Sequence, residues 1–466
     1  MSDVPDTLAG AAAALRAGTV SSVELTETSI ARADRFDKQL GTYLCRADDA
    51  ALEAARQADA ELEAGLDRGP LHGIPVGVKD IVATADLPTT AQSLVLDPAW
   101  GERGDAPVVE RLRAAGAVIT GKTTTMEFAI GLPDPTKPFP LPRNPWALDR
   151  WAGGSSSGTA NGVAAGIFWA GIGTDTGGSI RMPSALCGIT GLKPTFGRVP
   201  KSGVVPLSWS FDHVGPMART ARDCALMLDV IAGHDPSDPL SADVAPDAYA
   251  TALDGSVAGL RVGVLRRAYV DAPFVDPTAI AAFESALAAL ESGGAQIDEI
   301  DVPEWDILNE ACLPIFMSEA LAYHRRNLAE RWDDYGSFTR QMIASALFYT
   351  AADHVQAQRV RRFVASKVDD ILGEVDVIAT PTTGAGAPPV ENLDFATALT
   401  LPVFTSPWNA LGLPTISIPS GFTGDGLPVG LQLAGRRFDE ATVLRAADGF
   451  QALTDWHTRR APLAFG

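Results

Sequence analysis

The stretch that decides the fold runs from residue 153 to residue 200 and reads GGSSSGTANGVAAGIFWAGIGTDTGGSIRMPSALCGITGLKPTFGRVP. Its segment 171–181 places two glycines directly before Ser179. Because glycine has no Cβ atom, several backbone N–H groups can converge on one point there, as they do in an oxyanion hole. The hydroxyl-rich segment 153–158 predicts either an anion-binding nest or a simple turn.

A lysine stands inside an apolar run further upstream, residues 73–82, which reads GIPVGVKDIV. The run is short and rich in β-branched residues, so residues 74–82 are expected to form a buried strand. Unpaired lysine is rarely buried, and burial lowers its pKa so that it can be neutral near pH 7. Lys79 is therefore either a satisfied buried cation, paired with a neighbour such as Asp80, or a functional base.

Strand and helix patterns alternate along the chain, without a clear linker or repeat. This alternation predicts one large α/β domain, residues 1–466. Residues 317–372 are expected to be mostly helical. Expected helices span residues 8–16, 23–35 (with Ser22 as N-cap), 47–66, 107–115, 161–170, 220–232, 277–290 and 440–453. Expected strands span residues 74–82, 117–120, 260–265, 296–300, 375–380 and 415–419.

Two short motifs match patterns of other enzymes, but their surroundings argue against both. Residues 116–123, GAVITGKT, fit the P-loop pattern. A P-loop follows a strand, whereas a helix is predicted before Gly116 and a strand over residues 117–120. Residues 154–158, GSSSG, fit the nucleophile elbow, which also follows a strand, whereas residues 143–153 are predicted as a loop. None of the six histidines lies in a segment typical of a catalytic base.

Taken together, these segments resemble the amidase signature family. Residues 153–200 are similar to the family's core, and LHGIPVGVKD places Lys79 where the family has its lysine. The interval from Ser155 to Ser179 is 24 residues, as the family pattern requires. The segments TSPWNALGLPTISIPSG and GLPVGLQLAGRRFDE near the C-terminus are also similar to family segments. Ser157 departs from the pattern, because the family usually has glycine there.

The resemblance implies an α/β fold, with a mixed, mostly parallel twisted sheet surrounded by α-helices. In this fold the core is expected over residues 60–235 and 375–455, with a helical cover over residues 317–372. It also implies a Ser–cis-Ser–Lys triad: Ser179 is the nucleophile, Ser155 is the cis-serine, preceded by a cis peptide bond, and Lys79 is the base. The expected oxyanion donors are the backbone N–H groups of Thr176, Gly177, Gly178 and Ser179.

Three further residues are expected to support this site. Asp175 and Arg181 are predicted to brace the Gly-rich loop by ion pairing, and the alternative role of Arg181 is to bind a substrate carboxylate. Ser156 lies beside the cis-serine and is the candidate nucleophile only if the elbow interpretation holds. No metal ion or other cofactor is expected.

The resemblance implies a stand-alone hydrolase of linear amides, with aryl or hydrophobic acyl groups, that works through an acyl-enzyme. Hydrolysis of carbamates (urethanes) by the same triad is the alternative. A further alternative is the glutaminase subunit of a tRNA-dependent amidotransferase, which normally has an acidic residue shortly before a Thr-x-Pro-x-Asn stretch. Here that position is Pro402, before residues 405–409, and this disfavours glutamine.

Two segments are expected to wall an apolar substrate funnel. One is the irregular stretch 126–139, and the other is the helical cover. A few of the cover's large apolar side chains are expected to line the funnel: Phe316, Met317, Tyr323, Trp332, Phe338 and Phe348.

The charge balance excludes several other functions. The 466 residues include 37 Lys plus Arg against 57 Asp plus Glu, a net charge of −20. Such a chain lacks the basic surface that nucleic acids or anionic membranes require. The four cysteines are widely spaced, which predicts free thiols. We expect a cytoplasmic enzyme with a small-molecule substrate, acting as a monomer or homodimer.

Overall fold

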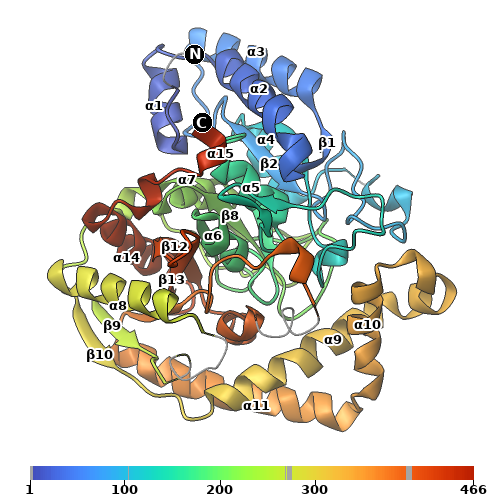
Figure 1. Ribbon diagram of the computed structural model, residues 1–466. Coiled ribbons are helices and arrows are strands. Elements are labelled where there is room, and N and C mark those ends of the chain that lie inside the picture. The colour runs from blue at the N-terminus through green and yellow to red at the C-terminus, as the bar shows by residue number, and fades with distance from the viewer. Residues whose placement is uncertain (1–3, 103, 268, 270–274, 395–400, 466) are drawn as a thin grey trace.

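The computed structural model describes residues 4–102, 104–267, 269, 275–394 and 401–465 (Figure 1). Within these ranges one eleven-stranded sheet forms the centre, in the order β1-β3-β2-β6-β8-β7-β12-β13-β11-β9-β10. Its strands are β1 (Tyr43–Arg46), β2 (Pro75–Lys79), β3 (Val118–Thr123), β6 (Ala170–Asp175), β7 (Thr190–Lys193), β8 (His213–Ala218), β9 (Arg261–Val264), β10 (Gln296–Glu299), β11 (Val377–Pro381), β12 (Thr415–Phe422) and β13 (Pro428–Gly435).

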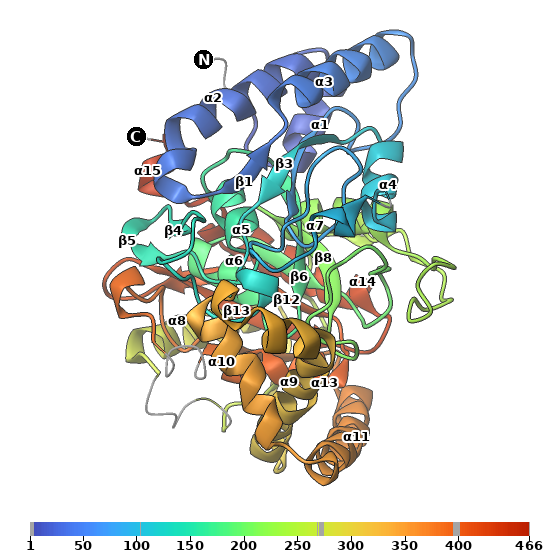
Figure 2. The ribbon, with the colours of Figure 1, turned by 90° about the vertical axis from the view of Figure 1, so that its right-hand side faces the viewer.

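Helices surround the sheet. They are α1 (Leu8–Arg16), α2 (Ser22–Leu40), α3 (Asp48–Glu63), α4 (Pro107–Ala114), α5 (Ser157–Ala164), α6 (Arg181–Cys187), α7 (Ala221–Ile231), α8 (Pro277–Ser292), α9 (Trp305–Glu330), α10 (Ser337–Ser345), α11 (Ala351–Glu374), α13 (Ser406–Leu411), α14 (Glu440–Leu453) and α15 (Pro462–Phe465). Figure 2 shows α9, α10 and α11 together at the opposite end of the molecule from α1, α2 and α3.

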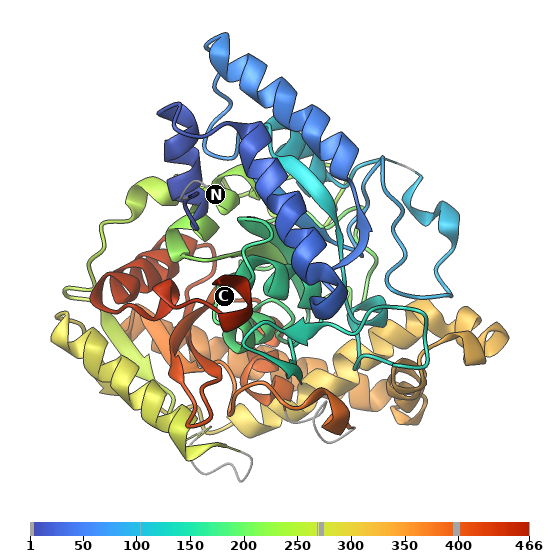
Figure 3. The same ribbon diagram turned by 45° about the horizontal axis from the view of Figure 1, so that its top comes forward.

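The sheet is mixed, as predicted. Parallel pairing joins β3, β2 and β6 on one side and β11, β9 and β10 on the other. The strands between these two groups, β8, β7, β12 and β13, pair antiparallel. The single large α/β domain with a sheet surrounded by helices is therefore confirmed, and Figure 3 shows the two chain ends close together on one side of it.

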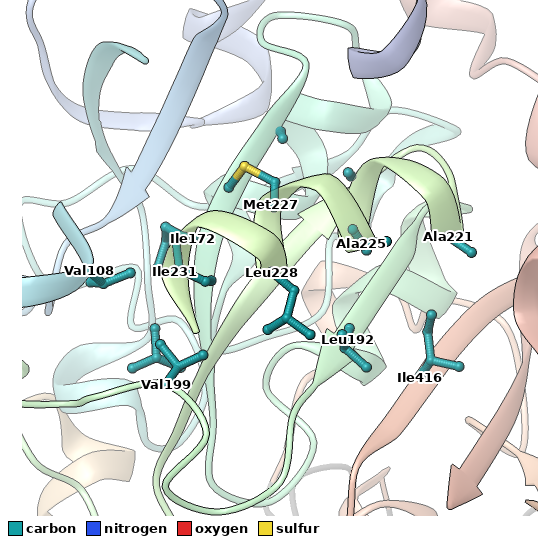
Figure 4. Close-up of a cluster of buried hydrophobic side chains, with 14 of the residues drawn as sticks. Val108, Ile172, Leu192, Val199, Ala221, Ala225, Met227, Leu228, Ile231 and Ile416 are labelled. Atoms are coloured by element: carbon teal, nitrogen blue, oxygen red, sulfur yellow. The ribbon is translucent and has the colours of Figure 1, made fainter. Parts of the chain in front are cut away.

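The main core lies between the sheet and α7. Ile172 of β6, Leu192 of β7 and Ile416 of β12 are fully buried, and Leu228 and Ile231 of α7 belong to the same cluster (Figure 4). Helix α7 begins with a capping box on Thr220, which fixes the start of the helix against the sheet. The other face of β7 lies against α6, since a Cβ atom at Gly191 would meet the Ser184 side chain of that helix.

Three local predictions were wrong. The helix predicted over residues 161–170 is α5 followed by strand β6, because the chain turns at Gly166, whose φ is +68°. The predicted loop at 143–153 contains a hairpin, β4 (Arg143–Asn144) and β5 (Ala147–Trp151). The N-cap of α2 is Ser21 rather than Ser22.

The P-loop match is explained by ordinary secondary structure. Helix α4 ends at Ala114 and strand β3 runs from Val118 to Thr123, so the supposed phosphate loop is itself part of a buried strand. The four cysteines are free, as the spacing predicted.

Candidate active site

Three chain segments bring Lys79, Ser155 and Ser179 together. Lys79 is the last residue of β2, Ser155 lies just before α5, and Ser179 lies between β6 and α6. Because β2 and β6 are parallel neighbours, the carboxyl ends of both strands lie at the same edge of the sheet. The Ser156 N–H donates to the Ser179 carbonyl oxygen at 3.1 Å and ties the two serine segments to each other.

Lys79 is fully buried and points at Ser155. Its Nζ donates to Ser155 Oγ and to Thr174 Oγ1, both at 2.7 Å. Burial lowers the pKa of Lys79 to about 7, against smaller opposing effects of Asp175 and Asp212. The suggested pairing with Asp80 is absent, because Asp80 Oδ1 lies 3.4 Å from Lys122 Nζ instead. Near neutral pH, Lys79 is thus in part an uncharged amine held against a serine hydroxyl.

The segment around Ser155 has the predicted backbone form. The peptide bond between Gly154 and Ser155 is cis. Ser156, by contrast, is fully buried, and its Oγ donates to the Thr174 carbonyl oxygen at 3.2 Å and accepts from the Thr174 N–H at 3.2 Å. This side chain therefore holds α5 against β6 and does not face the cavity described below.

Asp175 and Arg181 brace the Gly-rich loop, as predicted. The two buried side chains form a bidentate ion pair, with Arg181 Nη2 and Nε at 2.9 and 3.0 Å from the carboxylate. Burial alone would raise the pKa of Asp175, but the Arg181 guanidinium, with smaller contributions from Lys193 and Asn409, more than offsets this effect and holds the pKa below its ordinary value. Arg181 also donates to Asn409 and Gln432. It is fully buried, so its alternative role as a ligand for a substrate carboxylate is wrong.

The Asp175 carboxylate also occupies one of the four N–H groups that were predicted to be oxyanion donors. The Gly178 N–H donates to Asp175 Oδ1 at 2.8 Å, which removes it from the set. Within the described chain, no protein acceptor is found for the N–H groups of Thr176, Gly177 and Ser179. Gly178 has a φ of +126°, and a Cβ atom there would collide with the Thr405 side chain, so this position requires glycine.

A cavity of about 640 Å³, including its open mouth, lies against the two serines. Ser179 is half-buried in its wall beside Gly154 and Ser155. None of the described residues that line it is charged. The remaining walls are Met126, Ala129, Ile130, Gly131, Leu132, Trp151, Thr176, Gly177, Met182, Leu207, Phe316, Phe338, Met342 and Ser406.

Both predicted wall segments contribute to this cavity. Residues 126–132 form one side, and α9 and α10 provide Phe316, Phe338 and Met342 on the other. The other large apolar residues of the cover lie elsewhere: Met317 is in the core, and Tyr323, Trp332 and Phe348 are exposed.

Sequence reasoning missed Thr174 and Asp212. Thr174 Oγ1 accepts one hydrogen bond from Lys79, which fixes the orientation of the amine. Asp212 Oδ1 accepts from Thr176 Oγ1 at 2.6 Å and so anchors the loop that carries the candidate oxyanion donors. Thr174 lies in the Gly-rich stretch, so its position in the sequence could have identified it. Asp212 lies 36 residues from its partner Thr176, and no local sequence pattern marks it.

We expect kcat/KM for an amide to rise with pH through about 7. Lys79 accepts a proton only when it is neutral, and its pKa is about 7. The rate should therefore fall roughly tenfold per pH unit below this value and level off above it. A pH profile of kcat/KM, with circular dichroism as a check of folding at each pH, measures this; a rate that is flat through this range would contradict the role of Lys79.

Comparisons with known proteins agree with this fold and site. A family model described as amidase matches residues 24–444. A glutamyl-tRNA(Gln) amidotransferase subunit from Chloroflexus aggregans is 41% identical over 487 residues, covering 98% of both proteins. An amidase of Pseudomonas putida is also 41% identical, over 466 residues and 98% of both proteins. The native peptide amidase of Stenotrophomonas maltophilia has a TM-score of 0.83 and 31% identity, with 98% of each chain covered.

The fold and these relatives define an enzyme that acts on carbon–nitrogen bonds. The chain belongs to the amidase signature family. Among the described residues, no cluster of three or more His, Cys, Asp or Glu side chains is arranged to hold a metal ion. No helix in those ranges is long and apolar enough to cross a membrane.

Proposed function

We propose that the protein hydrolyses linear amides with aryl or hydrophobic acyl groups, through an acyl-enzyme on Ser179. The observation that carries this proposal is the uncharged cavity, walled by methionine and aromatic side chains, into which the half-buried Ser179 faces. An apolar acyl group gains free energy on entering such walls, at about 25 cal/mol per Å² of apolar surface removed from water.

Acylation begins with two proton transfers. Neutral Lys79 accepts a proton from Ser155 Oγ, and Ser155 accepts one from Ser179 Oγ, which attacks the amide carbon. The carbonyl π electrons move to the oxygen, and the N–H groups of Thr176, Gly177 and Ser179 stabilise the oxyanion. The tetrahedral intermediate collapses as Ser155 gives a proton to the departing nitrogen and recovers one from Lys79. The C–N bond breaks and the amine leaves.

Deacylation repeats these steps with water in place of the amine. Lys79 and Ser155 accept a proton from the attacking water, and the C–O bond to Ser179 breaks. Ser179 recovers its proton, the acid leaves, and all three side chains return to their starting states. Thr174 Oγ1 accepts one Lys79 N–H and so holds Nζ beside Ser155 Oγ, where the neutral amine can take up a proton.

The amidotransferase alternative meets an obstacle in the cavity. Overall identity does not decide between the two functions, since the chain is 41% identical to a relative of each kind. Glutamine carries an α-ammonium and an α-carboxylate, and none of the described lining residues offers an opposite charge. Leaving such groups without a partner costs several kcal/mol. Pro402, where an acidic residue was sought, lies in a short 3₁₀ helix, Leu401–Phe404.

A panel of substrates tests this proposal. Purified protein is expected to hydrolyse benzamide and hexanamide at least roughly 100-fold faster, in kcat/KM, than glutamine. Ethyl N-phenylcarbamate in the same panel measures the carbamate alternative. Glutamine turnover that exceeds turnover of the apolar amides would overturn the proposal in favour of the amidotransferase function. If a carbamate is preferred over every amide, the urethane hydrolase replaces the proposal.

A further inference from the structure

A second cavity adjoins the first on the lysine side of the site. It measures about 900 Å³, including its open mouth, and three residues line both cavities: Ala129, Thr176 and Leu207. Neither Ser155 nor Ser179 lines it, but Thr174, the acceptor for Lys79 Nζ, does. The two cavities therefore meet at the loop that carries the candidate oxyanion donors, with Ser179 on one side and Thr174 on the other.

The walls of this second cavity are apolar. Ile81, Val204, Val205, Pro206 and Trp209 form its sides. Trp209 is 59% exposed and lies toward solvent. A flat or branched apolar group can therefore be removed from water here over much of its surface.

The charged side chains that line the second cavity already have protein partners, whereas His213 Nε2 is buried without one among the described residues. The Asp212 carboxylate accepts from Thr176 Oγ1 and from the N–H groups of Leu207 and Ser208. Lys201 Nζ donates to the Trp209 carbonyl oxygen and lies 4.5 Å from the centre of a phenylalanine ring. Since these charges are satisfied within the protein, the cavity does not require a charged ligand.

We infer that this second cavity receives the amine half of a secondary amide, so that the substrate class is N-aryl or N-alkyl amides. The inference rests on the amide hydrolysis proposed above. In that reaction the acyl group lies in the cavity of Ser179, while Ser155 protonates the departing nitrogen. Ser155 lines the cavity of Ser179, and the second cavity adjoins that cavity at Ala129, Thr176 and Leu207, so the second cavity is placed to take the substituent on the departing nitrogen.

The test compares two substrates with the same acyl group. Benzamide leaves the second cavity empty, whereas benzanilide fills it with a phenyl ring. The rates of uncatalysed hydrolysis of the two compounds in base give the difference in reactivity between their leaving groups. After correction for this difference, wild-type kcat/KM should be at least roughly tenfold higher for benzanilide than for benzamide. Val204→Trp, which fills the cavity from its half-buried wall, should reduce the benzanilide-to-benzamide ratio of kcat/KM roughly tenfold.

Three further variants complete the test. Trp209→Ala removes an exposed wall without threatening the fold and should lower the same ratio several-fold. Val355→Trp, on the exposed face of α11 at 58% exposure, is the matched control and should leave the ratio unchanged. Leu132→Trp narrows the cavity of Ser179 and should lower kcat/KM for both substrates together.

The outcomes separate the inference from the proposed function. If Val204→Trp and Trp209→Ala both leave the ratio at its wild-type value, the inference is overturned while amide hydrolysis stands. If wild-type protein hydrolyses neither benzamide nor benzanilide, the proposed function fails and the inference fails with it.

Discussion

Replacing Lys79 by methionine is expected to lower kcat for amides by about 10³-fold or more while the protein remains folded. Methionine has a similar length and fills the same buried space, but it accepts no proton from Ser155. Removal of an amine that is costly to bury offsets the loss of its hydrogen bonds to Ser155 and Thr174. Steady-state kinetics on benzamide, together with a thermal melt, measure both halves of the prediction.

Two other lysine variants sharpen the result. Lys79→Arg keeps a positive charge that is not given up near neutral pH, so it should be as inactive as the methionine variant. Lys38→Met, at an exposed position on α2, is the matched control and should retain full activity. Near-normal turnover by Lys79→Met would remove the lysine from the mechanism.

Ser179→Ala should abolish amide hydrolysis to a similar extent, whereas Ser156→Ala should not. Ser179 is half-buried in the wall of the apolar cavity. Ser156 is fully buried, and its hydroxyl bonds only to the backbone of Thr174. Its loss should therefore cost about 1 kcal/mol of stability and less than about tenfold in kcat. The kinetics of the two variants, measured side by side, distinguish the nucleophile from its structural neighbour. An inactive Ser156→Ala beside an active Ser179→Ala would reverse the assignment.

Elements with a clear local pattern were predictable from the sequence. Helix α1 matches the expected range 8–16, and β2 was expected because residues 74–82 form a short run rich in β-branched residues. Strands β7, β8 and β13 were missed, because they are short or contain proline and glycine and are stabilised by their neighbours in the sheet. The antiparallel pairing of β7 with β12 joins segments far apart in the chain, and no local pattern encodes it, whereas β13 pairs with β12 in a local hairpin.

Some residues of the candidate site were likewise predictable from local motifs, whereas others were not. Lys79, Ser155 and Ser179 stand in compact motifs, and the resemblance assigned them roles. Two further partners of Arg181, by contrast, come from α13 and β13, more than 200 residues away. Only the folded chain shows that Asn409 and Gln432 complete its hydrogen bonds and close it off from substrate. The use of the Gly178 N–H by Asp175 likewise depends on how one turn is oriented.

Covalent labelling with a fluorophosphonate identifies the nucleophilic serine and measures how strongly its reactivity depends on Lys79. The probe loses fluoride as a serine Oγ bonds to phosphorus, and peptide mapping by mass spectrometry then identifies that serine. We expect one adduct per chain, on Ser179, absent from Ser179→Ala and formed far more slowly by Lys79→Met. An adduct on Ser156, or a rate of labelling that does not depend on Lys79, would overturn the roles given to Ser179 and Lys79.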